Sequence, residues 1–191
     1  MTTARTSPRI PLWRVLLLVF AIPVLLVGSL YVIRAFLPES HQSKSGVEIQ
    51  VGQVLPDFTL TALNGKSVKL SELPGKVHMI NFWATWCDSC MEEMPSLVAL
   101  RQAYFQRGFE ILGVNLDENP SLAIPKTLKE FRIKFPVFTD PDNQISDLFD
   151  VHAIPLTVII NSERKILLIK NGGHEWNSPS TRTRLDEWIV E

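Results

Sequence analysis

Hydrophobic and polar residues divide this chain into one long apolar segment followed by several shorter ones. The long segment, VLLLVFAIPVLLVGSLYVI, covers residues 15–33 and contains no charged residue. At about 1.5 Å per helical residue, it can nearly span a bilayer core of about 30 Å. Arg5, Arg9 and Arg14 precede it without an acidic residue, which favours a cytoplasmic N-terminus. The pattern therefore predicts a cytoplasmic segment at 1–14 and one transmembrane anchor at 15–33.

Two further observations bear on this anchor. Arg34 and Lys44 follow the apolar segment and weaken the charge bias that sets its orientation. A cleaved signal peptide is the main alternative, but such a peptide usually has a shorter apolar core and an A-x-A-like site, which residues 28–35 lack. An uncleaved anchor is therefore the preferred interpretation. With this orientation, every residue after Phe36 faces an oxidising, extracytoplasmic space.

The rest of the chain divides into a short linker and one domain. The segment at 34–46, which is polar from Pro38 onward, is predicted to be a linker, and a globular domain is predicted at 47–191. Early in this domain, Asn64-Gly65 separates two short apolar runs, which is typical of a β-hairpin. The two strands of that hairpin are predicted at 58–60 and 67–70.

The remaining apolar runs alternate between strand and helix patterns. The run VHMINFWA at 77–84 is rich in β-branched and aromatic residues, as expected for a buried central strand. Apolar residues then recur at helical spacing from Met91 to Ala103. Further strands are predicted at 109–116, 156–161 and 165–170, and further helices at 122–131, 145–149 and 180–190. This order predicts an α/β domain with a mixed central sheet flanked by helices.

Composition and cysteine usage narrow the choice of function. Hydrophobic residues make up 46% of the chain, as in a folded protein, and a formal net charge of −1 gives no reason to expect nucleic acid as a partner. The chain has two cysteines, Cys87 and Cys90, three positions apart. A structural disulfide stabilises mainly by closing a long loop of the unfolded chain, so this pair is badly placed for a structural role. A reactive role explains the cysteine pair better than a structural one.

The position of the cysteine pair suits redox chemistry. Cys87 follows a predicted buried strand and opens a predicted helix, where free N–H groups and the helix dipole stabilise a thiolate. Cys90 lies one turn further on, placed to attack a mixed disulfide on Cys87 and release a substrate. Two cysteines at this spacing on a strand-to-helix junction indicate thiol–disulfide exchange.

Three segments of the chain resemble a known family. They are FWATWCDSC at 82–90, VGQVLPDFTLTALNGKSVKLSELPGK at 51–76, and Ile154-Pro155. Together they are similar to the thioredoxin superfamily and, within it, to the TlpA/ResA-like branch, which includes the DsbE/CcmG proteins of cytochrome c maturation. The resemblance covers nearly all of 47–191. It implies a thioredoxin fold with an added N-terminal β-hairpin, and an N-terminal membrane anchor is common in that branch.

The resemblance also implies a substrate-binding segment. Ile154-Pro155 is expected to be a cis peptide packed against the cysteine pair, and X-Pro bonds adopt the cis form at low cost. Pro155 is expected to keep the backbone of the substrate groove open for strand-like pairing. Trp86 is expected to shield the disulfide and to belong to the same substrate-binding surface. Trp83, in contrast, is predicted to lie in the core because side chains alternate along a strand.

Two positions match the branch rather than thioredoxin itself. Asn81 stands six residues before the first cysteine, where thioredoxin has a buried Asp. Glu93, three residues after Cys90, fits a Glu that is common in the branch and precedes a Pro. One hypothesis is that Glu93 tunes the sulfurs or accepts a proton near Cys90, as part of the catalytic site. The alternative is an ordinary solvated residue on the helix surface.

The residues between the cysteines depart from the family pattern. They are Asp88-Ser89, where many relatives have a Pro before the second cysteine. A carboxylate beside Cys87 disfavours the thiolate, so Asp88 is predicted to raise the pKa of the Cys87 thiol. This predicts a reducing pair with a slow nucleophile rather than a strong oxidant.

These features predict an extracytoplasmic protein-disulfide oxidoreductase of the cytoplasmic membrane, single-pass, with its catalytic domain facing the periplasm or cell exterior. It is expected to work as a reductase on exported disulfide-containing proteins. The resemblance suggests apocytochrome c as a client, and a membrane electron donor has to supply the electrons. Cys87 attacks the substrate disulfide and Cys90 resolves the intermediate. No cofactor and no metal are expected.

Two alternatives stay open. The first is a copper-delivery module in which Cys87, Cys90 and His152 bind Cu(I), since thiolate and imidazole suit that metal. An exposed loop residue is the preferred interpretation of His152. The second is a thiol peroxidase, which is disfavoured because Ile80 and Ala84 stand where such enzymes have a Pro and a Thr or Ser.

Overall fold

A computed structural model describes residues 49–190. The predicted cytoplasmic segment, the predicted anchor at 15–33 and nearly all of the predicted linker lie outside the described residues. Within 49–190, no helix combines the length and the apolar character that crossing a bilayer requires.

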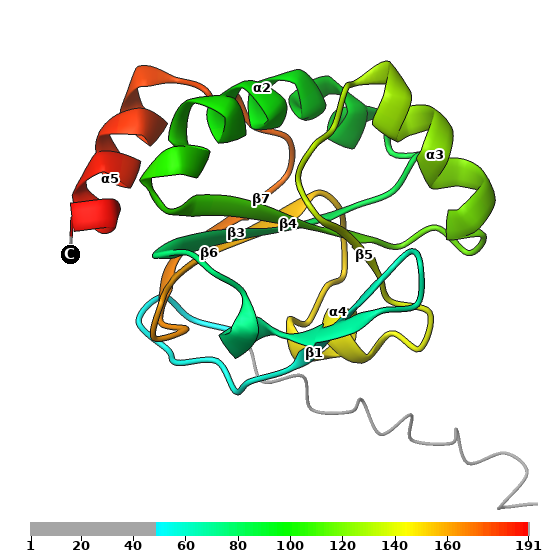
Figure 1. The fold of residues 1–191 in the computed structure, drawn as a ribbon, viewed down its shortest axis with the longest axis horizontal. Coiled ribbons are helices and arrows are strands. Elements are labelled where there is room, and N and C mark those ends of the chain that lie inside the picture. The colour runs from blue at the N-terminus through cyan, green and yellow to red at the C-terminus, as the bar shows by residue number, and fades with distance from the viewer. Residues whose placement is uncertain (1–48, 191) are drawn as a thin grey trace, which may run out of the picture. The chain divides into compact units, whose positions relative to one another are not determined.

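The described residues form one sheet of seven strands in the order β2-β1-β5-β4-β3-β6-β7 (Figure 1). The two central strands, β3 and β4, are parallel, and β5 continues this arrangement on the far side of β4. The pairs β3–β6, β6–β7, β1–β5 and β1–β2 are antiparallel. The strands are β1 Thr59–Ala62, β2 Ser67–Lys69, β3 Val77–Trp83, β4 Phe109–Asn115, β5 Val137–Thr139, β6 Leu156–Asn161 and β7 Ile166–Asn171. The predicted mixed sheet is confirmed.

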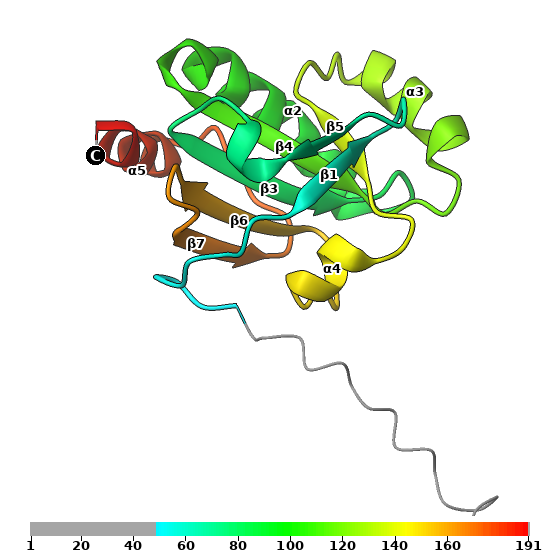
Figure 2. The same cartoon turned by 60° about the horizontal axis from the view of Figure 1, so that its bottom comes forward.

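Helices cover both faces of the sheet. In Figures 1 and 2, α2, α3 and α5 lie on one side of the sheet, and the short α4 lies on the other side near β1. The α-helices are α2 Asp88–Tyr104, α3 Pro120–Glu130, α4 Gln144–Leu148 and α5 Pro179–Val190, with 3₁₀ turns η1 Leu70–Glu72 and η2 Phe105–Arg107. Pro120 opens α3, where the missing N–H of a proline removes no helical hydrogen bond.

Strand β3 is buried along its whole length because both of its faces are covered. Met79 and Trp83 join the core beneath α2 and α5, whereas Ile80 and Phe82 join the core on the α4 side. The predicted burial of Trp83 is confirmed. By the same alternation, Asn81 lies on the α2 face between two core residues, and this places a polar side chain beneath the helix that carries the cysteines.

Strand β5 is absent from the elements that the sequence pattern predicts. All three of its residues pair with β4, and two of them, Phe138 and Thr139, also pair with β1, so this short strand joins the β1–β2 hairpin to the central sheet. A run of three residues is too short for the alternating pattern of a strand to be recognised.

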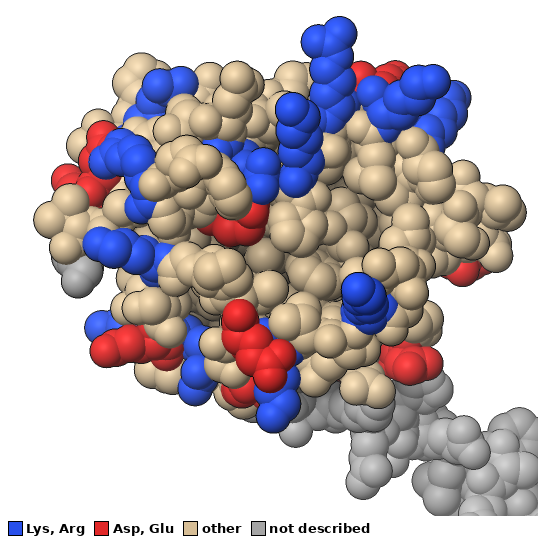
Figure 3. All heavy atoms as spheres, viewed as in Figure 1, with Lys and Arg blue, Asp and Glu red and all other residues tan. Residues whose placement is uncertain are grey.

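Charged side chains of both signs are interspersed on the face of the molecule seen in Figure 3.

Candidate active site

The two cysteines lie where β3 ends and α2 begins. Cys87 is the N-cap of α2 and is joined to Cys90 by a disulfide, with 5.2 Å between the two Cα atoms. The Cys90 backbone N–H donates to Cys87 Sγ at 3.2 Å, so a helix N–H is aimed at the first sulfur, as predicted. Cys87 is 7% exposed and Cys90 is fully buried. An incoming disulfide therefore reaches Cys87 first.

A cis peptide bond joins Ile154 to Pro155 directly opposite the pair. Cys87 Sγ lies 3.8 Å from the carbonyl oxygen of Ile154, so the loop before β6 contacts the first sulfur. The cis geometry implied by the family resemblance is therefore present. This loop and the start of α2 together border the Cys87 sulfur.

Glu93 is buried on the inner face of α2, so the alternative of a solvated helix residue is wrong. Its carboxylate accepts three hydrogen bonds. Asn81 Nδ2 donates to Oε1 at 2.8 Å, while the Trp176 indole N–H and the His174 backbone N–H donate to Oε2 at 3.0 and 3.1 Å. Burial raises the pKa of the Glu93 carboxyl, although these three donors act in the opposite direction.

Asn81 can support both protonation states of Glu93. Its Nδ2 donates to Glu93 and, at 3.0 Å, to Thr157 Oγ1, and its buried Oδ1 has no hydrogen-bond partner. A 180° rotation of the amide exchanges the two atoms and turns Oδ1 toward Glu93 and Thr157. A protonated Glu93 can then donate to Oδ1, as can the Thr157 hydroxyl. The pair therefore has a hydrogen-bonded arrangement for the carboxylate and another for the carboxylic acid.

A surface hollow gives Glu93 access toward solvent. This hollow has a volume of about 410 Å³ and is lined by Ser89, Glu92, Glu93, Gly173, His174 and Glu175. Ser89 lies between the two cysteines, and its hydroxyl oxygen is 3.6 Å from Cys87 Sγ. The carboxyl of Glu93 and the cysteine pair thus share one end of α2.

Asp117 positions the loop that leads into Cys87, and the sequence interpretation missed it. Its carboxylate accepts hydrogen bonds from the backbone N–H and the hydroxyl of Thr85 and, at 2.7 Å, from Asn115 Nδ2. The carboxyl ends of parallel strands meet at one edge of a sheet. An acid just after β4 could therefore have been expected beside the residues that follow β3.

Trp86 is the aromatic side chain that the site offers to solvent. It is 68% exposed and borders a shallow hollow together with Asp117 and the 82% exposed Leu122. The side chain is therefore available for contact with another molecule. Its predicted role in substrate binding stays a prediction.

His152 does not join the sulfurs. Its side chain is 83% exposed, and Nε2 lies 3.1 Å from a carboxylate oxygen of Asp150. Across residues 49–190, no group of three His, Cys, Asp or Glu side chains is arranged to hold a metal ion. The copper-delivery alternative therefore lacks its third ligand in this structure.

Comparisons with known proteins agree with this geometry. Residues 51–169 match the AhpC/TSA family. The thiol-disulfide oxidoreductase ResA of Bacillus subtilis (strain 168) is 37% identical over 124 residues, which are 65% of this chain and 69% of ResA. The chain belongs to the AhpC/TSA family and to its ResA-like thiol-disulfide oxidoreductases. Together with the Cys87–Cys90 pair, this assigns protein-disulfide oxidoreductase activity to the chain.

Solved structures similar to this ResA-like chain extend the match to its fold. A putative thiol:disulfide interchange protein DsbE from Chlorobium tepidum is 31% identical, with a TM-score of 0.63 over 75% of this chain and 97% of that one. A putative protein disulfide isomerase from Bacteroides thetaiotaomicron is 30% identical, with a TM-score of 0.65 over 75% of this chain and 92% of that one. The predicted thioredoxin-like α/β fold is confirmed.

Proposed function

We propose that this chain is an extracytoplasmic disulfide reductase for exported proteins. The observation that carries the proposal is the asymmetry of the pair, because Cys87 is slightly exposed beside Trp86 and Ile154 whereas Cys90 is buried. An asymmetric pair of this kind attacks with one sulfur and resolves with the other. The predicted anchor at 15–33 and its preceding arginines support a location outside the cytoplasm.

The reaction begins with both cysteines reduced. The Cys87 thiolate attacks a disulfide of the client, forms a mixed disulfide and displaces one client thiolate. Cys90 then loses its proton and attacks Cys87 Sγ, which releases the second client thiolate and leaves the Cys87–Cys90 disulfide. The client gains two electrons and the pair loses two. A membrane electron donor returns them, since an oxidising compartment does not.

Glu93 is proposed as the proton acceptor for Cys90. It lies one turn beyond Cys90 on α2, and its raised pKa brings it closer to the pH range in which a thiol proton is exchanged. After the Asn81 amide rotates, its Oδ1 can accept a hydrogen bond from the protonated carboxyl of Glu93, so the proton that Glu93 has accepted keeps a partner. Apocytochrome c is the proposed client on the strength of the family resemblance and the similarity to a putative DsbE protein.

Trapping the mixed disulfide in the host tests this proposal. In a Cys90→Ala protein, Cys87 can attack a client but nothing resolves the adduct, so exported proteins with reducible disulfides are expected to accumulate on it. Non-reducing gels and mass spectrometry identify these adducts, and Cys87→Ala is the matched control. Adducts in equal amounts on both variants, or none on either, contradict the proposed exchange mechanism. Exclusively cytoplasmic partners contradict the location.

Asp88 provides a smaller, separate prediction. Its carboxylate is exposed in the first turn of α2, directly after Cys87. Replacing it by Asn is expected to stabilise the Cys87 thiolate by about 0.2–1 kcal/mol, the usual worth of exposed charge interactions. Alkylation of reduced Cys87 near neutral pH should become about 1.4- to 5-fold faster. Glu92→Gln, which removes an exposed acid further along α2, is the control. An equal increase in the alkylation rate in that variant would show that the effect comes from the overall charge and not from the position of Asp88.

A further inference from the structure

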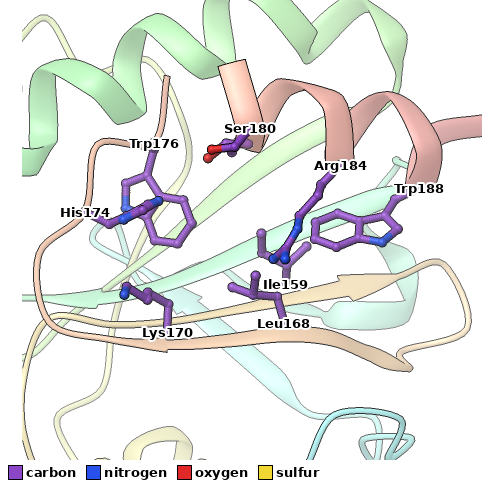
Figure 4. A pocket seen from close by; sticks show the side chains of 9 residues that line it. Ile159, Leu168, Lys170, His174, Trp176, Ser180, Arg184 and Trp188 are labelled. Atoms are coloured by element: carbon purple, nitrogen blue, oxygen red, sulfur yellow. The ribbon is translucent and has the colours of Figure 1, made fainter. Parts of the chain in front are cut away.

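A second cavity lies away from the cysteine pair, between α5 and strands β6 and β7. Its volume is about 260 Å³. Pockets for drug-sized compounds span roughly 300–1,000 Å³, so this one suits a compound of one or two rings. Ile159 and Leu168 form its apolar floor, and two indoles line it, those of Trp176 and Trp188 (Figure 4).

The charged side chains that line this cavity, which we call the α5 pocket, are both cationic. Lys170 lines it from β7 and Arg184 from α5, and Figure 4 shows Arg184 extending from the helix toward the strands. Within residues 49–190, neither side chain has a hydrogen bond or ion pair, and no Asp or Glu is among the lining residues. Two unpaired cations over an aromatic and aliphatic cavity are complementary to an anion with a flat apolar body.

The α5 pocket shares one side chain with the active site. Trp176 lines the pocket, and its indole N–H donates to Glu93 Oε2 at 3.0 Å. His174, another lining residue, packs its ring edge-on against Trp176 with 4.7 Å between centroids, and its backbone N–H donates to the same carboxylate oxygen. A molecule packed against Trp176 therefore restrains two of the three donors to Glu93.

We propose that the α5 pocket binds a small aromatic carboxylate and that Trp176 transmits its occupancy to Glu93. Arg184 and Lys170 bind the carboxylate, and the ring packs among the two indoles and the apolar floor. Holding Trp176 and His174 in place favours the ionised form of Glu93, because both donate to its carboxylate. The binding site stands apart from the proposed reductase function, whereas its effect on catalysis rests on the role proposed for Glu93.

Calorimetric titration of the full chain in nanodiscs tests the binding, with 2-naphthoate as the probe. Arg184→Gln and Lys170→Gln are each expected to weaken binding about tenfold, the loss of a charge-assisted hydrogen bond. Lys165→Gln, an exposed lysine on the same hairpin outside the pocket, should leave it unchanged. The neutral 2-naphthamide and inorganic phosphate are expected to bind at least about tenfold more weakly than 2-naphthoate.

Each other outcome overturns part of this assignment. No binding of 2-naphthoate, or binding that both pocket variants leave intact, overturns the site. Equal binding of the amide would show that the pocket selects for apolar shape and not for charge, and equal binding of phosphate would show that it selects for charge alone.

The link to Glu93 has its own test. 2-Naphthoate is expected to shift the pH profile of alkylation at the reduced cysteines in the unsubstituted protein but not in Glu93→Gln. An unchanged profile at saturating ligand overturns the link. Calorimetry does not depend on exchange activity, so failure of the reductase proposal leaves the binding test valid.

Discussion

Replacing Glu93 by alanine is expected to destabilise the folded protein by about 2–4 kcal/mol, because two buried donors and one part-buried donor lose their acceptor. These donors are Asn81 Nδ2, the Trp176 indole N–H and the His174 backbone N–H. Urea titration of the oxidised protein, followed by circular dichroism, measures the loss. Glu92→Ala is the matched control, since this neighbour on α2 is exposed and its removal should change stability by less than about 0.5 kcal/mol. Equal losses in the two variants contradict the buried network.

Glu93→Gln separates the charge of this residue from its packing. The glutamine oxygen can accept from Trp176 and His174, while its amide nitrogen faces Asn81. Rotation of the Asn81 amide turns the unpartnered Oδ1 toward that nitrogen, so the Trp176 and His174 donors keep an acceptor. The same rotation turns Asn81 Nδ2 away from its two acceptors. One buried donor group is left without a partner rather than three, so Glu93→Gln is expected to cost about 1–3 kcal/mol of stability, less than Glu93→Ala. Proton acceptance is lost, so the resolving step should slow while the fold is retained.

The pH dependence of stability gives an independent readout of the same carboxyl. Burial raises the pKa of Glu93 above its ordinary value of 4.5, so the folded protein holds this proton more tightly than the unfolded chain does. The stability from this group is fully present below the unfolded pKa and is lost as pH rises through the higher folded pKa. The Gln variant lacks this loss. The free energy of unfolding of Glu93→Gln, relative to the unsubstituted protein, should therefore increase as pH rises above about 4.5.

The sequence was most informative where local patterns determine structure. Strand β3 could be predicted from a continuous apolar run rich in β-branched and aromatic residues, and helix α2 from apolar residues that recur at helical spacing. The cysteine pair could be placed at their junction for the same reason. Strand β5 could not be predicted, because its three residues form a strand only through pairing with β4 and β1, which are distant in sequence.

The surroundings of Glu93 show the same limit within the site. The motif indicated that position 93 carries a Glu, but both a buried and a solvated side chain were compatible with the pattern. The structure decides between them through residues that follow much later in the chain, since His174 and Trp176 lie 81 and 83 positions beyond Glu93. No local spacing relates these positions. The network forms because the segment after β7 returns past the start of α2, where Gly173 lies close to Ser89.

Exchanging each cysteine for serine in turn is expected to give opposite results. In Cys87→Ser, reduction of a disulfide-bonded model peptide should fall at least about a thousandfold, because a neutral hydroxyl is no nucleophile at this position. Cys90 does not substitute for it, since that sulfur is fully buried. In Cys90→Ser, the attack is retained and stops at a stable adduct on Cys87. Stopped-flow kinetics measure the first effect, and mass spectrometry of the quenched reaction detects the second.

Labelling of the remaining thiol under denaturing conditions is the control for both serine variants, because it shows that each surviving sulfur is reduced and intact. The prediction depends on which sulfur a substrate disulfide can reach, so its sharpest test compares the rates of adduct formation in the two variants. With Cys87 at 7% exposure and Cys90 at 0%, the folded Cys90→Ser protein should form adducts far faster than Cys87→Ser. Similar rates in the two variants would mean that α2 opens before attack, and Cys87 would then lose its role as the sole attacking sulfur. A large difference, abolished when the protein is unfolded, assigns the order of the two sulfurs to the way β3, α2 and the Ile154-Pro155 loop enclose them.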